Sequence, residues 1–155
     1  MRVTVVVVGK IRGELSDAVR EYERRAGRYW KLDFIEVHQE SARSMTPSQV
    51  KDSEAKRILD RVPPQFDVVA MTRDGTGMDS PAFAHWLEAK MMDASSGVAF
   101  VIGGAFGLGD AVLRRSRLRL SLSDMTLPHE MARLFLAEQL YRAGTILRGE
   151  PYHKG

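Results

Sequence analysis

Cysteine is absent from this sequence, and no apolar run approaches the length of a membrane-spanning helix. Without cysteine the chain can form no disulfide, no zinc–thiolate site and no cysteine nucleophile. A helix that crosses a bilayer needs roughly 20 apolar residues. The short run at 3–8 is β-branched and is followed by no small-residue cleavage site, so it predicts a first strand rather than a signal peptide. These absences fit a cytoplasmic protein.

The length of 155 residues predicts one domain, 1–155, with a sizeable core. Hydrophobic residues make up 44% of the chain and charged residues 28%, as is typical of a globular protein. The sequence pI is near 9.4, and basic residues gather in two clusters: Arg20, Arg24, Arg25, Arg28 and Lys31, and Arg114, Arg115, Arg117 and Arg119. Such clusters favour a polyanionic partner, although solvated helix faces give the same pattern.

Segments with strand and helix periodicity alternate along the chain. Strands are expected at 3–8, 32–37, 66–72, 98–102 and 118–122. Helices are expected at 15–31, from Pro47 to 61, at 80–92, at 110–117 and at 128–148. The third helix is expected to have Ser80 as its N-cap and Pro81 as its first residue. Residues 39–49 are expected to form a polar loop, and 73–77 the loop after the third strand.

Alternating strands and helices predict an α/β fold, with a mostly parallel sheet flanked by helices and right-handed crossovers. The runs 5–8 and 98–102 are continuously apolar, as in central strands covered on both faces. Ligands of such sheets bind beyond the carboxyl ends of the strands. The strand exits 72–77, 103–109 and 123–129 are therefore expected to line one small-molecule site.

The glycine loop at 103–109 fits neither common nucleotide motif. Its glycines invert the G-x-G-x-x-G order of a dinucleotide site, and no Gly-Lys-Ser/Thr follows them as in a P-loop. Residues 129–133 read His-Glu-Met-Ala-Arg, with arginine where a zinc protease carries its second histidine. We therefore expect no metal site.

Ser123, Asp124 and His129 do not predict a hydrolase triad, because the G-x-S-x-G elbow is absent. We expect Ser123 and Asp124 to satisfy the backbone of their own loop. Exposed main-chain groups in that loop would suit an adenine ring.

The last helix and the tail carry two further signals. Apolar residues cover more than one face of the helix, which favours burial against a second subunit. After it, Tyr152, His153 and Lys154 offer a ring for stacking, a titratable imidazole and an ammonium group. An unstructured polar end is the alternative interpretation of this tail.

Four stretches share a recognisable order: VTVVVVGK at 3–10, VIGGAFG at 101–107, LSLSDMTLPH at 120–129 and AEQLYRAGTILRGEPYH at 137–153. They resemble the ribosomal RNA large subunit methyltransferase H family of the SPOUT superfamily, over essentially the whole chain and most weakly at 39–62. The resemblance implies a deep trefoil knot near the C-terminus and a homodimer. Knots are otherwise nearly absent from proteins, and periodicity alone does not predict one.

The resemblance also implies a cofactor and a substrate. S-adenosyl-L-methionine would be held by the knot loops, at Met71, Gly103, Gly104, Leu122, Ser123, Asp124, Met125, Thr126 and Leu127. The same loops follow from the strand exits. The implied reaction is methylation of N3 of a pseudouridine in the helix 69 loop of 23S rRNA on the assembled 70S ribosome, with no membrane or DNA partner.

The catalytic residues are hypotheses drawn from this chemistry. A sulfonium is already an activated electrophile, so the enzyme must align the methyl group with N3 and take up the imide proton. Histidine titrates in the useful range, which makes His153 the first candidate base and His129 the second. Tyr152 is expected to stack on an unpaired base. The side chains expected to meet phosphate or the developing anion are Arg133, Arg142 and Lys154.

Two other functions stay open on the sequence. A non-catalytic ribosome-binding or assembly factor would use the same basic surface and bind RNA with steep salt dependence. A SPOUT methyltransferase that acts on another RNA, such as tRNA, is the nearer alternative. The short chain argues against it, because it leaves no room for a separate RNA-binding domain.

Overall fold

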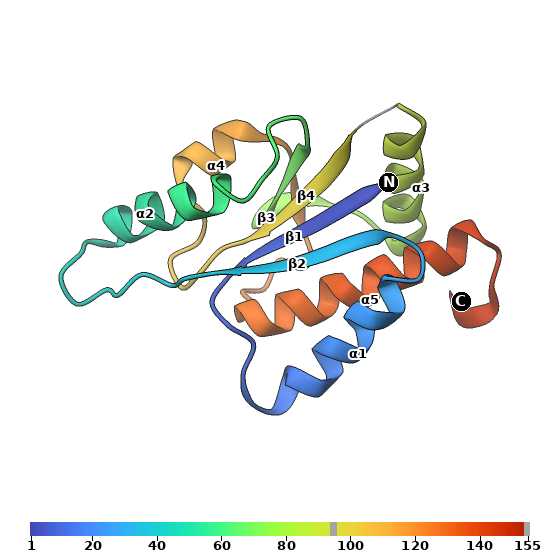
Figure 1. Ribbon diagram of the computed structural model, residues 1–155, viewed down its shortest axis with the longest axis horizontal. Helices are drawn as coiled ribbons and strands as arrows, with labels where there is room; N and C mark the ends of the chain where they lie inside the picture. The colour runs from blue at the N-terminus through green and yellow to red at the C-terminus, as the bar shows by residue number, and fades with distance from the viewer. Residues whose placement is uncertain (94–95, 154–155) are drawn as a thin grey trace.

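Five parallel strands form one sheet in the order β2-β1-β4-β3-β5 (Figure 1). The computed structural model describes residues 1–93 and 96–153, the side chain of His153 excepted. The strands are β1 (Arg2–Val8), β2 (Lys31–Val37), β3 (Asp67–Gly77), β4 (Gly97–Ile102) and β5 (Ser116–Ser121). The helices are α1 (Ser16–Ala26), α2 (Pro47–Leu59), α3 (Ser80–Met92), α4 (Asp110–Arg115) and α5 (His129–Leu147), with 3-10 turns η1 (Gly13–Leu15) and η2 (Pro151–His153). The expected α/β fold is confirmed.

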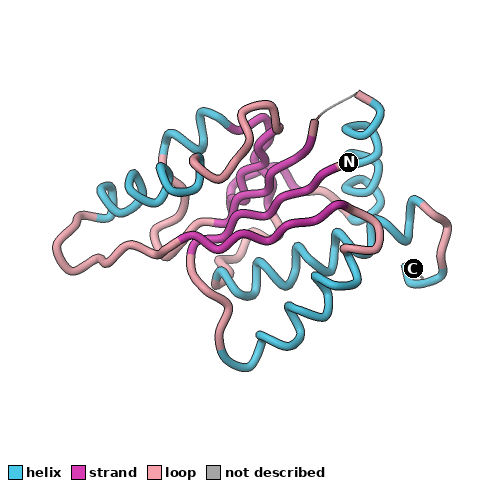
Figure 2. The backbone as a smooth tube through the Cα atoms, in the orientation of Figure 1, coloured by secondary structure: helices cyan, strands magenta, loops and turns pink. Residues whose placement is uncertain are grey.

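Helices cover both faces of this sheet, as Figure 2 shows: α1, α3 and α5 lie on one face, and α2 and α4 on the other. Val3, Val5 and Val7 of β1 join the core on the first face, and Val6 and Val8 join the core on the second. Because both faces are covered, β1 and β4 are buried almost throughout and read as continuous apolar runs. Within the described residues, no helix has the length and apolar character needed to cross a membrane.

Helix α1 ends at Ala26, although the apolar spacing predicted a helix to residue 31. Gly27 follows, and its N–H donates to the carbonyl of Glu23 at 3.0 Å. The chain then turns through Trp30, whose indole N–H donates to the carbonyl of Leu140 on α5 at 2.8 Å. A tertiary contact therefore fixes the turn between α1 and β2, and periodicity along the chain carries no signal of it.

Strand β3 runs to Gly77, so the expected loop at 73–77 is wrong. Met71 and Thr76 both align with Leu120 of β5, which makes the residues between them a bulge in one strand. A Cβ on Gly75 would stand 2.6 Å from the carbonyl of Arg119, so only glycine fits there. At the bulge, β3 leaves its pairing with the edge strand β5 and then resumes it.

Side-chain caps set the starts of α2 and α3. Thr46 and Gln49 form a reciprocal capping box around Pro47, which confirms the start of α2. The helix ends at Leu59 rather than 61. Helix α4 ends at Arg115 rather than 117, because β5 begins at the next residue.

The N-cap of α3 is Asp79, not Ser80 as predicted. A carboxylate oxygen of Asp79 accepts the N–H of Ala82 at 2.8 Å. Ser80 is the first helical residue, and its hydroxyl donates to the side chain of Gln139 on α5 at 2.7 Å. The cap moves by one residue because Ser80 has a tertiary partner.

Gly144 marks the closest approach between α5 and the α1–β2 turn. A Cβ at this position would stand 2.2 Å from Cγ of Tyr29 and 2.6 Å from its Cβ. The Tyr29 side chain is held in place, since its hydroxyl donates to Glu150 at 2.6 Å and Arg148 lies over its ring at 4.7 Å.

Gly144→Ala therefore tests packing against helix propensity. Propensity favours alanine by about 1 kcal/mol, whereas overpacking costs about 1–3 kcal/mol. We expect the free energy of unfolding, measured in urea, to fall by about 1–2 kcal/mol. The control is Gly27→Ala, where a Cβ meets only ordinary contacts at 3.4 Å. A Gly144→Ala variant more stable than the wild type would contradict this packing.

Candidate functional site

A cavity of about 870 Å³ opens at the carboxyl ends of β4 and β5, at the bulge of β3 and beside the first turn of α5. Its walls come from residues 71–74, 102–108 and 122–129 except 124, with Gln39, Leu120 and Ala132 completing them. The three strand exits predicted from the sequence therefore line one cavity. Residues 75–77 and 109 of the predicted exits lie outside the lining. Of the cofactor residues that the resemblance implies, Asp124 alone lies outside it, and Asp124 is exposed.

The glycine loop approaches the cavity as bare backbone. The N–H of Gly107 donates to the carbonyl of Gly104 at 3.0 Å, and the φ angle of Gly107 is +85°, which closes a tight turn. A Cβ at Gly103 would stand 2.9 Å from the carbonyl carbon of Gly107. Side chains larger than hydrogen would force this turn apart.

The loop after β5 is held by its own serines. The hydroxyl of Ser121 lies 2.9 Å from the carbonyl oxygens of both Arg73 and Ser123, which ties the loop to the β3 bulge. The hydroxyl of Ser123 accepts the N–H of Met125 at 3.0 Å. Ser123 thus satisfies loop backbone as expected and is not part of a nucleophilic triad.

Thr72 lies in the first predicted strand exit but is not among the cofactor residues that the resemblance implies. Its hydroxyl is buried and has no hydrogen-bond partner among the described residues. Buried hydroxyls are normally bonded, so an open one in a cavity wall is suited to a ligand. The sequence signal for this role was the position of a polar residue just after the buried part of a strand.

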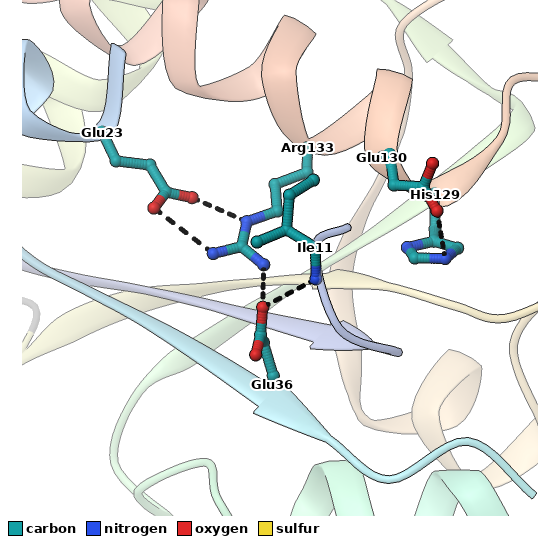
Figure 3. A network of polar contacts seen from close by, with 6 residues as sticks. All are labelled: Ile11, Glu23, Glu36, His129, Glu130 and Arg133. Carbon is teal, nitrogen blue, oxygen red and sulfur yellow. Dashed lines mark hydrogen bonds and ion pairs between the residues drawn. The ribbon is translucent and has the colours of Figure 1, made fainter. Parts of the chain in front are cut away.

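His129 is the candidate base that lies at this cavity. It is the first residue of α5, and its Nε2 is 3.0 Å from the carboxylate of Glu130 (Figure 3). Gly9, after β1, makes room for the ring, since a Cβ there would stand 3.0 Å from Cε1 of His129. Gly9, in the first sequence motif, therefore makes room for His129, the last residue of the third motif.

Tyr152 and Arg142 lie near the other end of α5. The ring of Tyr152 is 4.5 Å from that of Tyr141, and Cζ of Arg142 lies 4.9 Å over it. Burial, a hydrogen bond with Tyr22 and the nearby Glu138 carboxylate raise the pKa of Tyr152 to about 12, so its hydroxyl stays neutral.

Within one chain the structure does not bring these residues to the cavity. Thirteen residues of α5 separate His129 from Arg142, and a helix rises about 1.5 Å per residue, which gives roughly 20 Å. The predictions for the His153 side chain and for Lys154 lie outside the described residues.

Arg133, one turn into α5, is buried with 5% of its surface exposed. Its Nε donates to Glu23 of α1 at 2.6 Å, and its Nη1 donates to Glu36 of β2 at 2.6 Å (Figure 3). Glu36 also accepts the N–H of Ile11 at 3.0 Å. This network joins α5, α1, β2 and the segment after β1. Arg133 is thus a structural tie rather than the expected phosphate contact.

Glu36 makes the network sensitive to pH. Burial by itself raises the pKa of Glu36, but the N–H of Ile11 and the guanidinium of Arg133 together lower it below the ordinary value. A carboxyl group with a lowered folded pKa stabilises the fold above its unfolded pKa, about 4.3 for glutamate. That stabilisation is lost as the pH falls through the folded pKa.

Among the described residues, no group of three or more histidine, aspartate or glutamate side chains is arranged to hold a metal ion. Besides backbone amides and carbonyls, the polar groups of the lining are hydroxyls, the imidazole of His129 and the side chains of Gln39, Arg73 and Asp74. Such walls suit an organic molecule with its own donors and acceptors.

Comparison with known proteins assigns the family. The family model described as "Predicted SPOUT methyltransferase" matches residues 1–153. Two solved structures share the fold. A probable methylase family protein from Haemophilus influenzae has a TM-score of 0.54 and 15% identity, over 99% of this chain and 70% of that one. A putative methyltransferase from Legionella pneumophila in complex with SAM has a TM-score of 0.50 and 12% identity, over 92% of this chain and 66% of that one. The chain belongs to the SPOUT methyltransferases.

Curated relatives narrow the assignment. The protein named ribosomal RNA large subunit methyltransferase H from Gemmatimonas aurantiaca is 53% identical, over 99% of this chain and all of its own length. Those of the same name from Listeria monocytogenes and Acetivibrio thermocellus are 43% and 42% identical over the same shares. The chain is a member of the ribosomal RNA large subunit methyltransferase H family.

Arg133→Met tests the structural tie. We expect it to lower the free energy of unfolding at pH 7 by about 3 kcal/mol, because removing one partner of a buried ion pair leaves the other charges buried and unpaired. Adding Glu23→Gln and Glu36→Gln should recover most of the loss. The matched control is Arg24→Met, whose exposed pair with Glu21 should cost under about 1 kcal/mol. Equal effects of the two single variants would contradict the argument.

The same variants test the pH dependence. Wild-type stability, followed by thermal unfolding, should fall as the pH drops below about 4.3 and protonates Glu36. The Arg133→Met variant should lose less over this window, because its Glu36 has no guanidinium to lower the pKa. Parallel curves for the two proteins would show that Arg133 does not set that pKa.

Proposed function

We propose that this protein transfers a methyl group from S-adenosylmethionine to N3 of a pseudouridine in the helix 69 loop of 23S rRNA, on the assembled ribosome. The observation that carries the proposal is the cavity in which the exits of β3, β4 and β5 meet. Family membership supports rRNA methylation, and the match of the four sequence motifs supports the particular base. We propose a single domain over 1–155.

The cavity fits this cofactor in size and in chemistry. Backbone of Gly103, Gly104 and the 122–127 loop would hold the adenine and ribose, Met71 would add apolar contact, and the open hydroxyl of Thr72 would take one hydrogen bond. When bound, the cofactor supplies a methyl group on a sulfonium that is already activated. The protein must therefore exclude water and align the acceptor nitrogen, which rigid strand ends do well.

The acceptor nitrogen carries a proton that must leave before or during transfer. His129 lies at the cavity wall, with Glu130 on its Nε2 to orient the ring. Imidazole can accept a proton near neutral pH, which makes His129 a base or a relay to one. We keep His153 as the first candidate base, with Tyr152 stacking on an unpaired base and Arg142 near the substrate.

These tail residues need a second copy of the chain to reach a cavity. Their distance along α5 is roughly 20 Å, and Met131 and Phe135, on the half of α5 nearer the cavity, are 45% and 42% exposed. Exposed apolar side chains on an otherwise packed helix favour burial in an interface. We propose a homodimer in which the tail of one subunit completes the cavity of the other.

Topology and charge support two further parts of the proposal. Strand β5 lies outside β3, while α5 returns to pack beside α1 and α3, an arrangement compatible with a C-terminal trefoil knot. Arg114, Arg117 and Arg119 are exposed on or beside the edge strand β5, whose carboxyl end reaches the cavity. We propose that they contact rRNA phosphates.

The deciding experiment uses 70S ribosomes from a strain that lacks this modification. Purified protein and labelled S-adenosylmethionine are added, and digested 23S rRNA is analysed by mass spectrometry. One methyl group on the helix 69 pseudouridine is the expected result. Label on another RNA, or no label while the cofactor binds, would overturn the substrate and leave the family assignment intact.

Deletion of residues 152–155 tests the tail. We expect methyl transfer to fall by about 100-fold or more, the usual contribution of a general base. Cofactor affinity, measured by calorimetry, should change little, because the cofactor contacts that we propose all come from the strand exits that line the cavity. Deletion of 154–155 alone separates the last two residues from Tyr152 and His153. Full turnover by the longer deletion would exclude a catalytic tail.

A further inference from the structure

Glu54 of α2 is a buried charged residue that neither the packing nor the proposed reaction explains. Only 2% of its surface is exposed. Its Oε2 accepts the N–H of Glu40 at 3.0 Å, whereas its Oε1 is buried with no hydrogen-bond partner among the described residues. Leaving a buried carboxylate oxygen without a donor costs free energy, and a bound ligand is one way to supply the donor.

The open oxygen lies beside the glycine loop. A Cβ on Gly104 would stand 3.0 Å from Oε1 of Glu54 and 3.1 Å from Cγ1 of Val8. The φ angle of Gly104 is not among the positive ones, so backbone geometry does not require glycine there. Space does, because any side chain would close the approach to Oε1.

Glu54 also lines a second cavity of about 490 Å³, between residues 39–43 and the glycine loop. This cavity shares Gln39, Ala105 and Phe106 with the larger one, so a molecule bound in it would lie next to the cofactor. Phe106 is 43% exposed and offers an aromatic face. The exposed Arg43 adds a positive charge to the lining.

The other carboxylate of this cavity is already occupied. Glu40 accepts hydrogen bonds from the hydroxyl of Ser53 and from Nη2 of Arg57, each at 2.6 Å. Besides the polar side chains of Gln39 and Ser41, the described lining then offers one open acceptor at Glu54, one aromatic face at Phe106 and one cation at Arg43. An unpaired nucleotide matches all three, through its N–H edge, its ring and its phosphate.

We propose that this second cavity binds an unpaired base of the RNA substrate beside the target nucleotide. The base stacks on Phe106, donates an N–H to Oε1 of Glu54 and places its phosphate near Arg43. Guanine is such a base, because its N1–H can donate to Oε1, while Oε2 already accepts the N–H of Glu40. Since Oε1 is closed to solvent, the base enters by parting residues 39–43 from the glycine loop. The proposal rests on the proposed function for the identity of its ligand as RNA.

The test measures binding without turnover. Guanosine 5′-monophosphate and its 1-methyl derivative are titrated by NMR into protein saturated with S-adenosylhomocysteine, so that the larger cavity is filled. Methylation removes the one donor meant for Glu54. We expect the 1-methyl nucleotide to bind about tenfold more weakly, the effect of leaving one buried acceptor unpaired.

Two variants and a control assign the contact. Glu54→Gln keeps the shape and the acceptor for the Glu40 N–H but can place a donor at the Oε1 position. It should weaken guanosine monophosphate about tenfold and leave the 1-methyl nucleotide unchanged. Phe106→Ala, an exposed position that is safe for folding, should weaken both nucleotides alike. The exposed Glu14→Gln is the charge-matched control and should change neither.

The outcomes separate this proposal from the proposed function. No measurable binding of guanosine monophosphate, equal binding of the two nucleotides, or insensitivity to both variants overturns the second cavity as a base site, whatever the ribosomes show. Ribosomes that stay unmethylated, while nucleotide binding depends on Glu54, overturn the reaction and leave the base site standing.

Discussion

All five strands of the sheet run parallel, so their carboxyl ends meet at one edge and each connection must cross back over a face. Both faces are then covered by helices, which removes the inner strands from water and gives them their unbroken apolar sequence. The edge where the strands end is covered by loops instead of helices. Backbone, small residues and a few polar groups gather there, and the larger cavity is the result.

The charge network around Arg133 complements that arrangement. Helix α5 packs on the sheet mainly through apolar contacts, which fix its distance but constrain its sliding weakly. A guanidinium held by carboxylates from α1 and β2 adds direction to the contact. The first turn of α5, with His129 at the cavity, is therefore held relative to the strand ends.

The fold was largely predictable because alternating periodicities report local structure and burial. Five strands, five α-helices and the loops after β4 and β5 follow from them. The errors occur where tertiary contacts decide: at Trp30 against α5, at Ser80 with its partner on α5, and in the β3 bulge beside β5. That the side-chain oxygens of Thr72 and Glu54 lack a hydrogen-bond partner could likewise not be predicted from the sequence, because a missing partner is visible only in three dimensions.

Helix α5 carries a candidate base near one end and the aromatic–arginine cluster of the tail near the other. Its nineteen residues make it a rigid spacer, about 28 Å long at 1.5 Å per residue. In the homodimer that we propose, that length would set where each tail meets the other subunit. One inserted residue would turn the tail by about 100° around the helix axis while shifting it by only 1.5 Å. Orientation, more than reach, thus limits how far this helix can vary in length.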